Sequence, residues 1–443
     1  MRDAFIANNR FGLGARPGTL AAAAGDPRGW LTAQLGAAGA VPDLLADETA
    51  SAPMIAEFQR ALKDRGNGGA EEVIRRQFRD VLMRELALRT YVQIESETPF
   101  VERLVAFWSN HFTASVQRPL LAGVVGAYER EAIRPHVAGT FRDLLGAVIK
   151  HPAMLSYLDN LLSFGPNSRA GRATGRGLNE NLARELLELH TLGVDAEYTQ
   201  DDVTALAMIL TGWSIGRAKS DEAGHFVFQD KAHEPGEKTL LGVRFEDAGI
   251  EEGERALDML ASHPATARHV ATKLARHFVA DEPPADAVAR LETVFRESGG
   301  DLHVLTRAIV DLDAAWAEPL SKLKTPVEFT VSALRALGGN RDIEAKKLLG
   351  SLRLMGQVPF SAPSPAGWPD RASDWASPQA LMERAEWSMS VAAKVARGID
   401  PAALLDGTIA PVAPEDTRLA VARAPDRTEA VAMLLACPEF QWR

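Results

Sequence analysis

The chain has 443 residues, of which 46% are hydrophobic and 24% are charged, the balance of an ordinary globular protein. Its 49 Lys and Arg residues against 59 Asp and Glu residues give a formal net charge of −10. An acidic chain lacks the basic surface of a nucleic-acid-binding protein and is poorly suited to an anionic membrane. Composition therefore argues against both kinds of partner, although it names no reaction.

Cysteine content and the first residues bear on the cellular compartment. Cys437 is the only cysteine, which excludes an intramolecular disulfide and a zinc site built on cysteines. The segment from Met1 to Gly18 has no apolar core of the kind that a secretory signal needs. The longest apolar runs, such as Ala205–Leu210, are far too short to span a membrane. We therefore expect a cytoplasmic protein without a membrane span.

Helical periodicity dominates the chain. Apolar residues recur at steps of three and four over Glu71–Glu95, and Thr98 followed by Pro99 begins a second helix. Proline stands at the same position of further expected helices at Pro152, Pro264 and Pro438. The remaining expected helices are Glu180–Leu192, Asp201–Leu210, Glu254–Ser262, Ala265–Val279, Pro284–Ser298, Leu302–Leu312, Pro326–Leu337, Ile343–Leu354, Pro378–Ala396, Glu415–Arg423 and Arg427–Leu435.

Strand signal is confined to one short region. Phe226–Phe228 and Thr239–Leu241 flank a turn-rich loop and predict a minor β-hairpin near residues 224–242. The sequence thus predicts an all-α fold, a large multi-helix single body, with one domain over residues 1–443. A working subdivision is an N-terminal helical part with a polar site (1–215), a hairpin insertion (216–250) and a C-terminal helical part (251–443).

Two long stretches without periodicity interrupt the helices. The first, residues 160–178, is rich in Gly, Asn, Ser and Arg, and the second, residues 356–377, carries four prolines together with Trp368 and Trp375. Loops of this length inside a compact protein are usually functional or disordered. Because it holds two tryptophans, we expect the second loop to pack against the protein.

Gly212–Gly216 matches the Gly-x-Ser-x-Gly motif of serine hydrolases, with Ser214 as the nucleophile. That motif requires a strand before the serine and a helix after it. Here the preceding residues have helical spacing and a polar loop follows. The pattern favours a helix that ends at Gly212 and a core role for Trp213, with a serine hydrolase as a lesser alternative.

The densest polar segment runs from Asn179 to Gly193. Glu180, Arg184 and Glu188 are spaced for a ladder of ion pairs on one helix. His190 shares an apolar stripe with Leu182 and Leu186, so it is either a core histidine that bonds to backbone groups or a buried acid–base or metal-binding residue near Glu185. The number of polar groups exceeds what packing alone needs.

Three other groups of residues are candidates for chemistry. His111 ends the helix that Pro99 begins, where the helix dipole favours a charged imidazole. Asp159 and Asn160 carry oxygens that suit a hard cation, although such residues also form ordinary turns. His269, Lys273 and His277 lie on one face of a helix, together with Arg268 and Arg276, and form either a local anion site or, in the interpretation that we favour, a solvated basic face.

These segments lead to two hypotheses. The first is an enzyme with a polar site between helices, metal-assisted if a divalent cation binds. Its candidate catalytic residues are His111, Glu180, Arg184, Glu185 and His190; its candidate substrate-binding residues are Asn110, Asn160, Asn179, Asn181 and Trp213; and its candidate metal ligands are Asp159, Asn160, Glu185 and His190. The second is a non-catalytic scaffold or partner-binding protein, in which the same residues form a structural network.

Several strings of the sequence resemble one bacterial family. They are Asn9–Gly18, Trp108–Thr113, His151–Met154 with Asp159-Asn160, Asn179–Gly193, Tyr198–Val203, Leu210–Trp213, His263–Arg268 and Ser364–Asp370. By these motifs, which span nearly the whole chain, the protein resembles the domain-of-unknown-function 1800 family. The resemblance implies a mainly helical protein with no assigned reaction. It also implies, as a candidate partner, a sulfatase-like protein of a second uncharacterised family that is often encoded alongside and exported.

A weaker resemblance is to animal-type haem peroxidases. Phe107–Thr113 and Asn179–Leu192 follow the order of a distal histidine and a later helix that ends in His-Thr-Leu. This resemblance implies haem, with His269 or His277 as the residue to test for the proximal ligand. Leu178 stands where those enzymes carry an arginine, which argues against a haem cofactor.

Overall fold

The protein is almost entirely helical. The computed structural model describes residues 1–63, 70–339 and 344–443. Within them, strands are limited to two small antiparallel sheets of two strands each. The all-α class with a minor hairpin element, predicted from helical periodicity, is confirmed.

The first half of the chain contains α1 (Arg2–Ile6), α2 (Thr19–Ala23), α3 (Pro27–Gln34), α4 (Asp43–Ala46), α5 (Ser51–Lys63), α6 (Ala70–Glu95), α7 (Pro99–His111), α8 (Pro119–Tyr128), α9 (Phe141–Lys150), α10 (Pro152–Tyr157), α11 (Arg169–Thr174), α12 (Asn181–Glu185), the π-helical turn η6 (Leu186–His190) and α13 (Gln200–Ile209). The strands β1 (Trp213–Ile215), β2 (Phe226–Phe228), β3 (Lys238–Leu240) and β4 (Val243–Phe245) follow.

The second half contains α14 (Ile250–Ser262), α15 (Pro264–Phe278), α16 (Ala285–Glu297), α17 (Leu302–Val310), α18 (Ala314–Ala317), α19 (Pro326–Ala336), α20 (Ala345–Leu354), α21 (Ala372–Trp375), α22 (Pro378–Val395), α23 (Pro401–Asp406), α24 (Glu415–Ala422), α25 (Arg427–Ala436) and α26 (Pro438–Gln441). The helix expected over Ile343–Leu354 corresponds to α20, and Ile343 itself lies outside the described residues.

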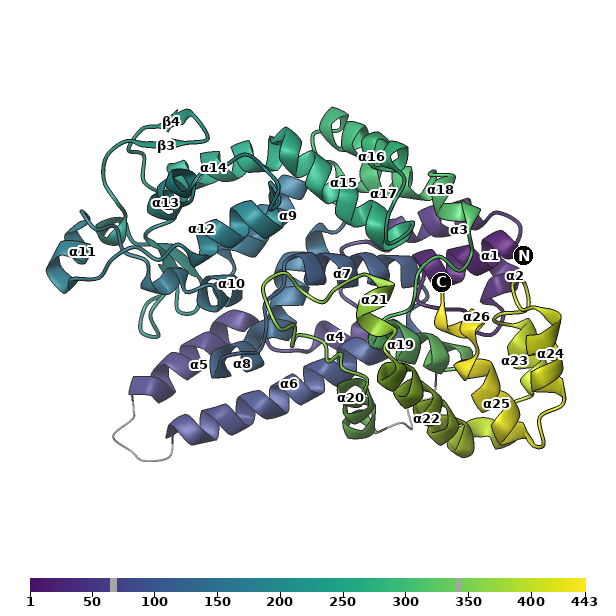
Figure 1. Cartoon of the computed structure of the whole chain (residues 1–443). Coiled ribbons are helices and arrows are strands. Elements are labelled where there is room, and N and C mark those ends of the chain that lie inside the picture. The colour runs from purple at the N-terminus through teal and green to yellow at the C-terminus, as the bar shows by residue number, and fades with distance from the viewer. Residues whose placement is uncertain (64–69, 340–343) are drawn as a thin grey trace.

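α7 runs through the middle of the molecule, with α14–α17 on one side and α5, α6 and α8 on the other (Figure 1). One cluster of buried hydrophobic residues draws members from Ala4 in α1 to Phe440 in α26. The two ends of the chain lie on the same side of the molecule (Figure 1), and backbone hydrogen bonds join Lys322 and Lys324 to Arg443 and Gln441. The shared core explains why both halves pack as one body.

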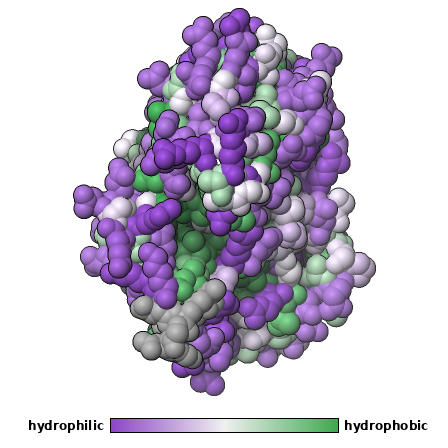
Figure 2. All heavy atoms as spheres, turned by 90° about the vertical axis from the view of Figure 1, so that its left-hand side faces the viewer, coloured by the Kyte–Doolittle hydropathy of each residue, from purple (hydrophilic) through white to green (hydrophobic). Residues whose placement is uncertain are grey.

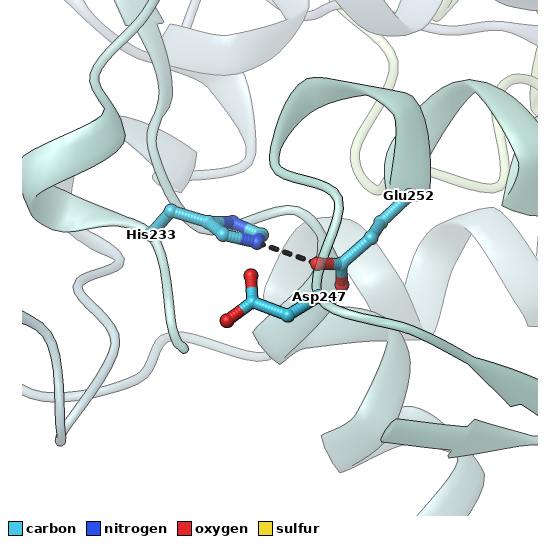
Figure 3. A group of neighbouring side chains, drawn as sticks. All are labelled: His233, Asp247 and Glu252. Carbon is cyan, nitrogen blue, oxygen red and sulfur yellow. Dashed lines mark hydrogen bonds and ion pairs between the residues drawn. The ribbon is translucent and has the colours of Figure 1, made fainter. Parts of the chain in front are cut away.

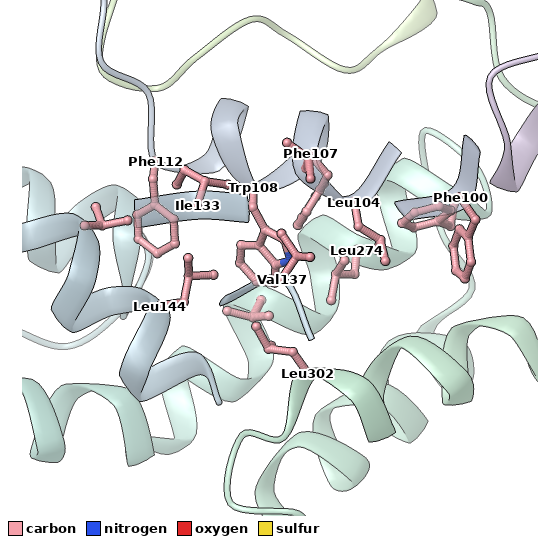
Figure 4. Close-up of a cluster of buried hydrophobic side chains, with 14 of the residues drawn as sticks. Phe100, Leu104, Phe107, Trp108, Phe112, Ile133, Val137, Leu144, Leu274 and Leu302 are labelled. Atoms are coloured by element: carbon pink, nitrogen blue, oxygen red, sulfur yellow. The ribbon is translucent and has the colours of Figure 1, made fainter. Parts of the chain in front are cut away.

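The sequence of α7 gives this helix two different faces. Phe100, Leu104, Trp108 and Phe112 repeat every four residues and point into the core (Figure 4), and each is at most 1% exposed. They pack with residues of neighbouring helices, including Leu144, Leu274 and Leu302 (Figure 4). Arg103, Ala106 and Asn110 lie on a different face, which lines a cleft. Burial of the aromatic stripe therefore fixes where the polar face points.

The helix starts predicted from proline are found in the structure. Pro99, Pro152, Pro264 and Pro438 begin α7, α10, α15 and α26. In two of these helices the histidine before the proline also caps the helix, since the Nδ1 atoms of His151 and His263 accept hydrogen bonds from the second helical N–H. Histidine is an unusual cap, and the sequence alone did not reveal this role.

The strands pair differently from the predicted hairpin. β2 pairs with β1, and a long loop connects these two strands. β3 pairs with β4. The β3–β4 turn consists of Leu241 and Gly242, both at positive φ (49° and 74°). Leucine is rare in such a turn, and here Asp202 accepts a hydrogen bond from the Leu241 N–H at 2.6 Å. Because this support comes from α13, local sequence did not predict it.

The segment around Ser214 has the reverse of a nucleophile-elbow context. Helix α13 precedes it, Gly212 turns the chain at φ 84°, and Ser214 itself lies in β1, opposite Val227. No helix follows β1 directly in the described chain. Trp213 is fully buried, as the core interpretation expects. The interpretation of Ser214 as the nucleophile of a Gly-x-Ser-x-Gly elbow is therefore wrong.

The outer surface reflects the composition. Hydrophilic residues cover most of the face shown in Figure 2, while hydrophobic residues gather in a hollow near its middle. Among the described helices, none combines the length and hydropathy that a membrane crossing requires.

The packing of Trp213 against α14 yields a stability prediction. A Cβ atom on Gly253 would lie 2.2 Å from Cζ2 of Trp213. We expect Gly253→Ala to lower the free energy of unfolding by about 1–3 kcal/mol, because the ring has no room to move. Denaturant titration measures the change. In a Trp213→Phe background, which removes the clashing atoms, the same substitution should cost less.

Gly350→Ala in α20 is the matched control, since nothing lies within 4 Å of a Cβ at that position. It should be neutral or stabilising by up to about 1 kcal/mol, because alanine favours a helix. Equal losses for both alanine variants would contradict the role given to Trp213.

Candidate functional site

A cleft of about 370 Å³ lies between α7, α15 and the N-terminal part of α19. The loop between α20 and α21, residues 356–371, forms another wall, and α6 contributes Arg89 and Gln93. Phe107, Val327, Phe360 and Trp368 give the walls an apolar character. Volume and lining are those of a small-molecule site.

The proline-containing loop is firmly attached to α7. The side chain of Asn110 donates to the Trp368 carbonyl at 2.9 Å and accepts from the Trp368 N–H at 2.7 Å. Val116 and Ser115, just beyond α7, bond to the carbonyls of Phe360 and Ala362 at 2.9 and 2.8 Å. The expectation that this loop packs against the protein is confirmed, and Asn110 is the residue of α7 that holds it.

A histidine–aspartate pair lies in the cleft. His277 Nδ1 is 3.1 Å from Asp370 Oδ2, and His277 Nε2 is 3.4 Å from the Arg103 guanidinium. This arrangement suits a neutral imidazole that donates to Asp370 and accepts from Arg103. Although burial opposes the ionisation of Asp370, its interaction and hydrogen bond with His277 and the charges of Lys322 and Arg443 lower its pKa to about 2. Burial lowers the pKa of His277, and Asp370 opposes that change.

Arg103 is already engaged by the protein. It forms an ion pair with Glu328, and it donates to the carbonyls of Gly12 and Asn9 at 2.6 and 3.2 Å. Arg443 lies 3.1 Å from the same carboxylate. Burial would raise the pKa of Glu328, but the two guanidinium groups hold it well below its usual range. This ion cluster closes the base of the cleft.

Lys273 differs from the other basic residues of the cleft. Arg89 and Arg371 pair with Glu129 and Glu282, at 2.8 and 2.9 Å. Lys273 makes no hydrogen bond or ion pair with any residue in the part of the chain that the structure describes. Burial lowers its pKa to about 8; Asp370 opposes this effect, and Arg276 reinforces it. A cation without a partner at a cleft is a candidate ligand-binding group.

Two further polar groups of the cleft lack partners. His111 Nε2 is 3.2 Å from the carbonyl of His190 and therefore donates to it, which leaves a lone pair on Nδ1. That Nδ1 and the Trp368 Nε1–H are buried and make no hydrogen bond with a described residue. Since buried polar groups are normally satisfied, these two atoms are free for a bound molecule or water. Burial, with Lys273 as the next contribution, keeps the pKa of His111 well below its usual range.

The structure brings only part of the predicted site to the cleft. Asn110 and His111 line it. His190 lies behind His111, with ring centroids 6.2 Å apart, and is fully buried. Burial, with Lys273 and His269, lowers the pKa of His190 to about 3. It is a core residue. Neither ring nitrogen makes a hydrogen bond with the backbone of a described residue, although the core interpretation expected such a bond.

The other predicted residues of the Asn179–Gly193 segment lie away from the cleft lining. Arg184 is 3.0 Å from Glu180 and 3.7 Å from Glu188, which is the ion-pair ladder that their spacing predicts. The Asn179 side chain accepts from the exposed Asn181 N–H at 3.0 Å. Glu185 is half-buried, and burial together with Glu188 raises its pKa. These residues stabilise the helical segment formed by α12 and η6 and the residues that precede it.

Asn160 and Asp159 have structural partners, whereas the indole Nε1–H of the fully buried Trp213 makes no hydrogen bond with a described residue. The Asn160 amide donates to the carbonyls of Leu210 and Trp213 at 3.1 and 3.0 Å. Asp159, at φ 61°, pairs with the Arg118 guanidinium. The Asn160 amide and the Asp159 carboxylate therefore already have partners within the protein.

Sequence reasoning missed Lys273, His277 and Asp370 as parts of one site. The signal was present in the spacing of His269, Lys273 and His277, but we favoured a solvated basic face. A solvated face is wrong for these three residues, because the loop that carries Asp370 and helix α7 pack against them. Within this group of basic residues the interpretation fits Arg268, whose side chain is 74% exposed. The loop contact that buries the stripe joins positions far apart in sequence.

One group of described residues has the composition of a metal site. Potential ligand atoms of His233, Asp247 and Glu252 lie within 4.8 Å of one another (Figure 3). None of the candidate ligands Asp159, Asn160, Glu185 and His190 belongs to it. However, Glu252 lies 2.8 Å from the buried Lys238 ammonium and 3.0 Å from His233. Because Lys238 already neutralises Glu252, a divalent cation would meet strong repulsion, and we regard the group as a structural ion network.

The structure describes a helical protein with a cleft at the junction of α7, α15 and the loop after α20. The chain belongs to the family described as protein of unknown function (DUF1800), whose model matches residues 6–442. No curated protein and no solved structure matches it.

The unpartnered lysine leads to a stability prediction. Lys273→Met removes a charge that burial disfavours, so it should raise the free energy of unfolding near pH 7 by about 1 kcal/mol. Because folding lowers the pKa of Lys273 from 10.5 to about 8, the unfolded chain binds more protons between these values. The contribution of residue 273 to the free energy of unfolding therefore rises with pH between these two pKa values in the wild type. The Met variant has no such pH-dependent contribution.

Thermal unfolding of both proteins near neutral pH and at the upper end of this window measures the difference. Lys394→Met is the control, since Lys394 is exposed on α22, and it should change stability by less than about 0.5 kcal/mol. A destabilised Lys273→Met protein would mean that the ammonium is satisfied in solution.

Proposed function

We propose that this protein is an enzyme that binds a small organic anion with an apolar part in the cleft beside Lys273. The observation that carries the proposal is the ammonium group of Lys273, which lines the cleft and has no partner among the described residues. A ligand carboxylate or phosphate would supply the missing partner.

The charge around the cleft supports an anionic ligand. Its lining contains the cationic side chains Arg89, Arg103, Lys273, Arg276 and Arg371, against the carboxylates Glu328, Asp370 and Asp374. Arg89, Arg103 and Arg371 pair with Glu129, Glu328 and Glu282, so the lining cations without a carboxylate partner among the described residues are Lys273 and Arg276. Arg276 adds a second available group, because among the described residues its guanidinium bonds only to a backbone carbonyl, that of Asp281, at 3.2 Å. Clefts of one sign attract ligands of the other.

The His277–Asp370 pair supports a catalytic role. A carboxylate that fixes one imidazole nitrogen leaves the other to exchange protons with a substrate. His277 follows Lys273 by one turn of α15, so an anion held by Lys273 would lie close to this imidazole. Among the described residues, the hydrogen-bond partner of Nε2 is Arg103, at the long distance of 3.4 Å. In this proposal Lys273 and Arg276 bind, and His277 transfers the proton.

The binding proposal is tested with benzoate as the probe, compared with benzyl alcohol of the same shape. We expect benzoate to bind the wild type and the alcohol to bind at least about tenfold more weakly, because only the carboxylate pairs with the cleft cations. Lys273→Met should weaken benzoate binding by a similar factor, and Lys394→Met should not. Ligand-observed NMR measures all four affinities. Equal binding of acid and alcohol would refute an anion site.

The cytoplasmic location and the sulfatase-like partner remain proposals. They are in tension, because such partners are often exported. Cell fractionation, combined with purification of the protein from its native cells, would show in which compartment the two proteins meet, or that they do not associate.

A further inference from the structure

We propose that Lys273 forms an imine with a carbonyl group of the bound molecule, so that the substrate class is small oxo acids with an apolar side chain. The inference rests on the proposed function and assigns to Lys273 a chemical step in addition to binding. It begins from geometry. Lys273 is the lysine in the lining of the cleft and has no partner among the described residues, and the same lining includes the apolar side chains of Phe107, Val327 and Phe360.

An amine reacts with a carbonyl only when it has lost its proton. A lysine paired with a carboxylate keeps that proton, whereas a desolvated lysine near another cation loses it more easily. Lys273 has both features, since burial lowers its pKa to about 8 against the effect of Asp370, and Arg276 lowers it further. Compared with an ordinary surface lysine, the neutral fraction near pH 7 is larger by a factor on the order of a hundred.

The reaction balances without an oxidant or reductant. The lone pair of the Lys273 amine attacks the carbonyl carbon and forms the C–N bond, while the electrons of the C=O π bond move to oxygen. The nitrogen gives up its protons, and the oxygen gains two protons and leaves as water. The products are one imine and one water molecule. His277, one turn further along α15, is placed to carry a proton from nitrogen to oxygen through Nε2.

The cleft retains a partner for the acid group after the imine forms. Arg276 lies in the lining, on the same helix, and has no carboxylate partner among the described residues. Its guanidinium can hold a carboxylate through two parallel hydrogen bonds. The indole N–H of Trp368, which is buried and has no hydrogen-bond partner among the described residues, is a further donor. The ligand's apolar part would lie against Phe107, Val327 and Phe360.

Reductive trapping tests this step. The wild type is incubated with phenylpyruvate and sodium cyanoborohydride, which converts an imine to a stable secondary amine. We expect the intact mass to rise by the mass of the probe less one oxygen atom, with the added group on Lys273 in peptide maps. Labelling of Lys273 should be at least about tenfold faster than that of any other lysine, because its neutral fraction is larger. Benzoate should slow it by occupying the cleft.

Lys273→Arg is the key variant, because it keeps a cation and removes the reactive amine. It should bind benzoate and lose the label, while Lys394→Arg should be labelled like the wild type. Labelling spread over exposed lysines, or no label at all, would overturn the imine proposal even if benzoate binds. Failure of benzoate to bind the wild type would instead overturn the proposed function.

Discussion

The buried ion cluster of Arg103, Glu328 and Arg443 is the constraint on which the rest of the structure depends. Glu328 forms ion pairs with two guanidinium groups, and these in turn hold backbone carbonyls of the N-terminal segment and of α15. Removing Glu328 would leave both guanidinium groups without this carboxylate in the interior, at a cost of about 3–5 kcal/mol. Through these contacts the two ends of the chain, α7 and α19 are fixed relative to one another, and the cleft acquires a rigid base.

The two faces of α7 connect this base to the site. The aromatic stripe from Phe100 to Phe112 sets the rotation of the helix, because any other rotation would expose it. With that rotation, Arg103 lies at the ion cluster and Asn110 lies under the proline-containing loop, where it bonds to Trp368. α15 contributes Lys273 and His277, and the loop contributes Asp370. The chemistry of the cleft thus comes from three segments that only the assembled core brings together.

Local patterns predicted what local interactions determine. The proline at the start of α7, the ladder from Glu180 to Glu188 and the packing of the tryptophan-containing loop could all be predicted, because each depends on neighbouring residues or on composition. The pairing of β3 with β4 could not, since Asp202 on another helix supports the Leu241 turn. The candidate site shows the same limit. His111 and Asn110, which line the cleft, were proposed as candidates from one local motif, whereas the Lys273, His277 and Asp370 group depends on a contact between positions about a hundred residues apart, His277 with Asp370.

The prolines of the 356–377 loop have a consequence for selectivity. Proline restricts the backbone even in the unfolded chain, so a wall that lacks regular secondary structure can still be stiff. With Pro359 and Pro369 at the cleft and Asn110 bonded to Trp368, this wall is shaped before any ligand arrives. A preorganised wall loses little conformational entropy when it binds a molecule of complementary shape. The same wall adapts poorly to a molecule of a different shape. The protein should therefore accept a narrow set of closely related compounds.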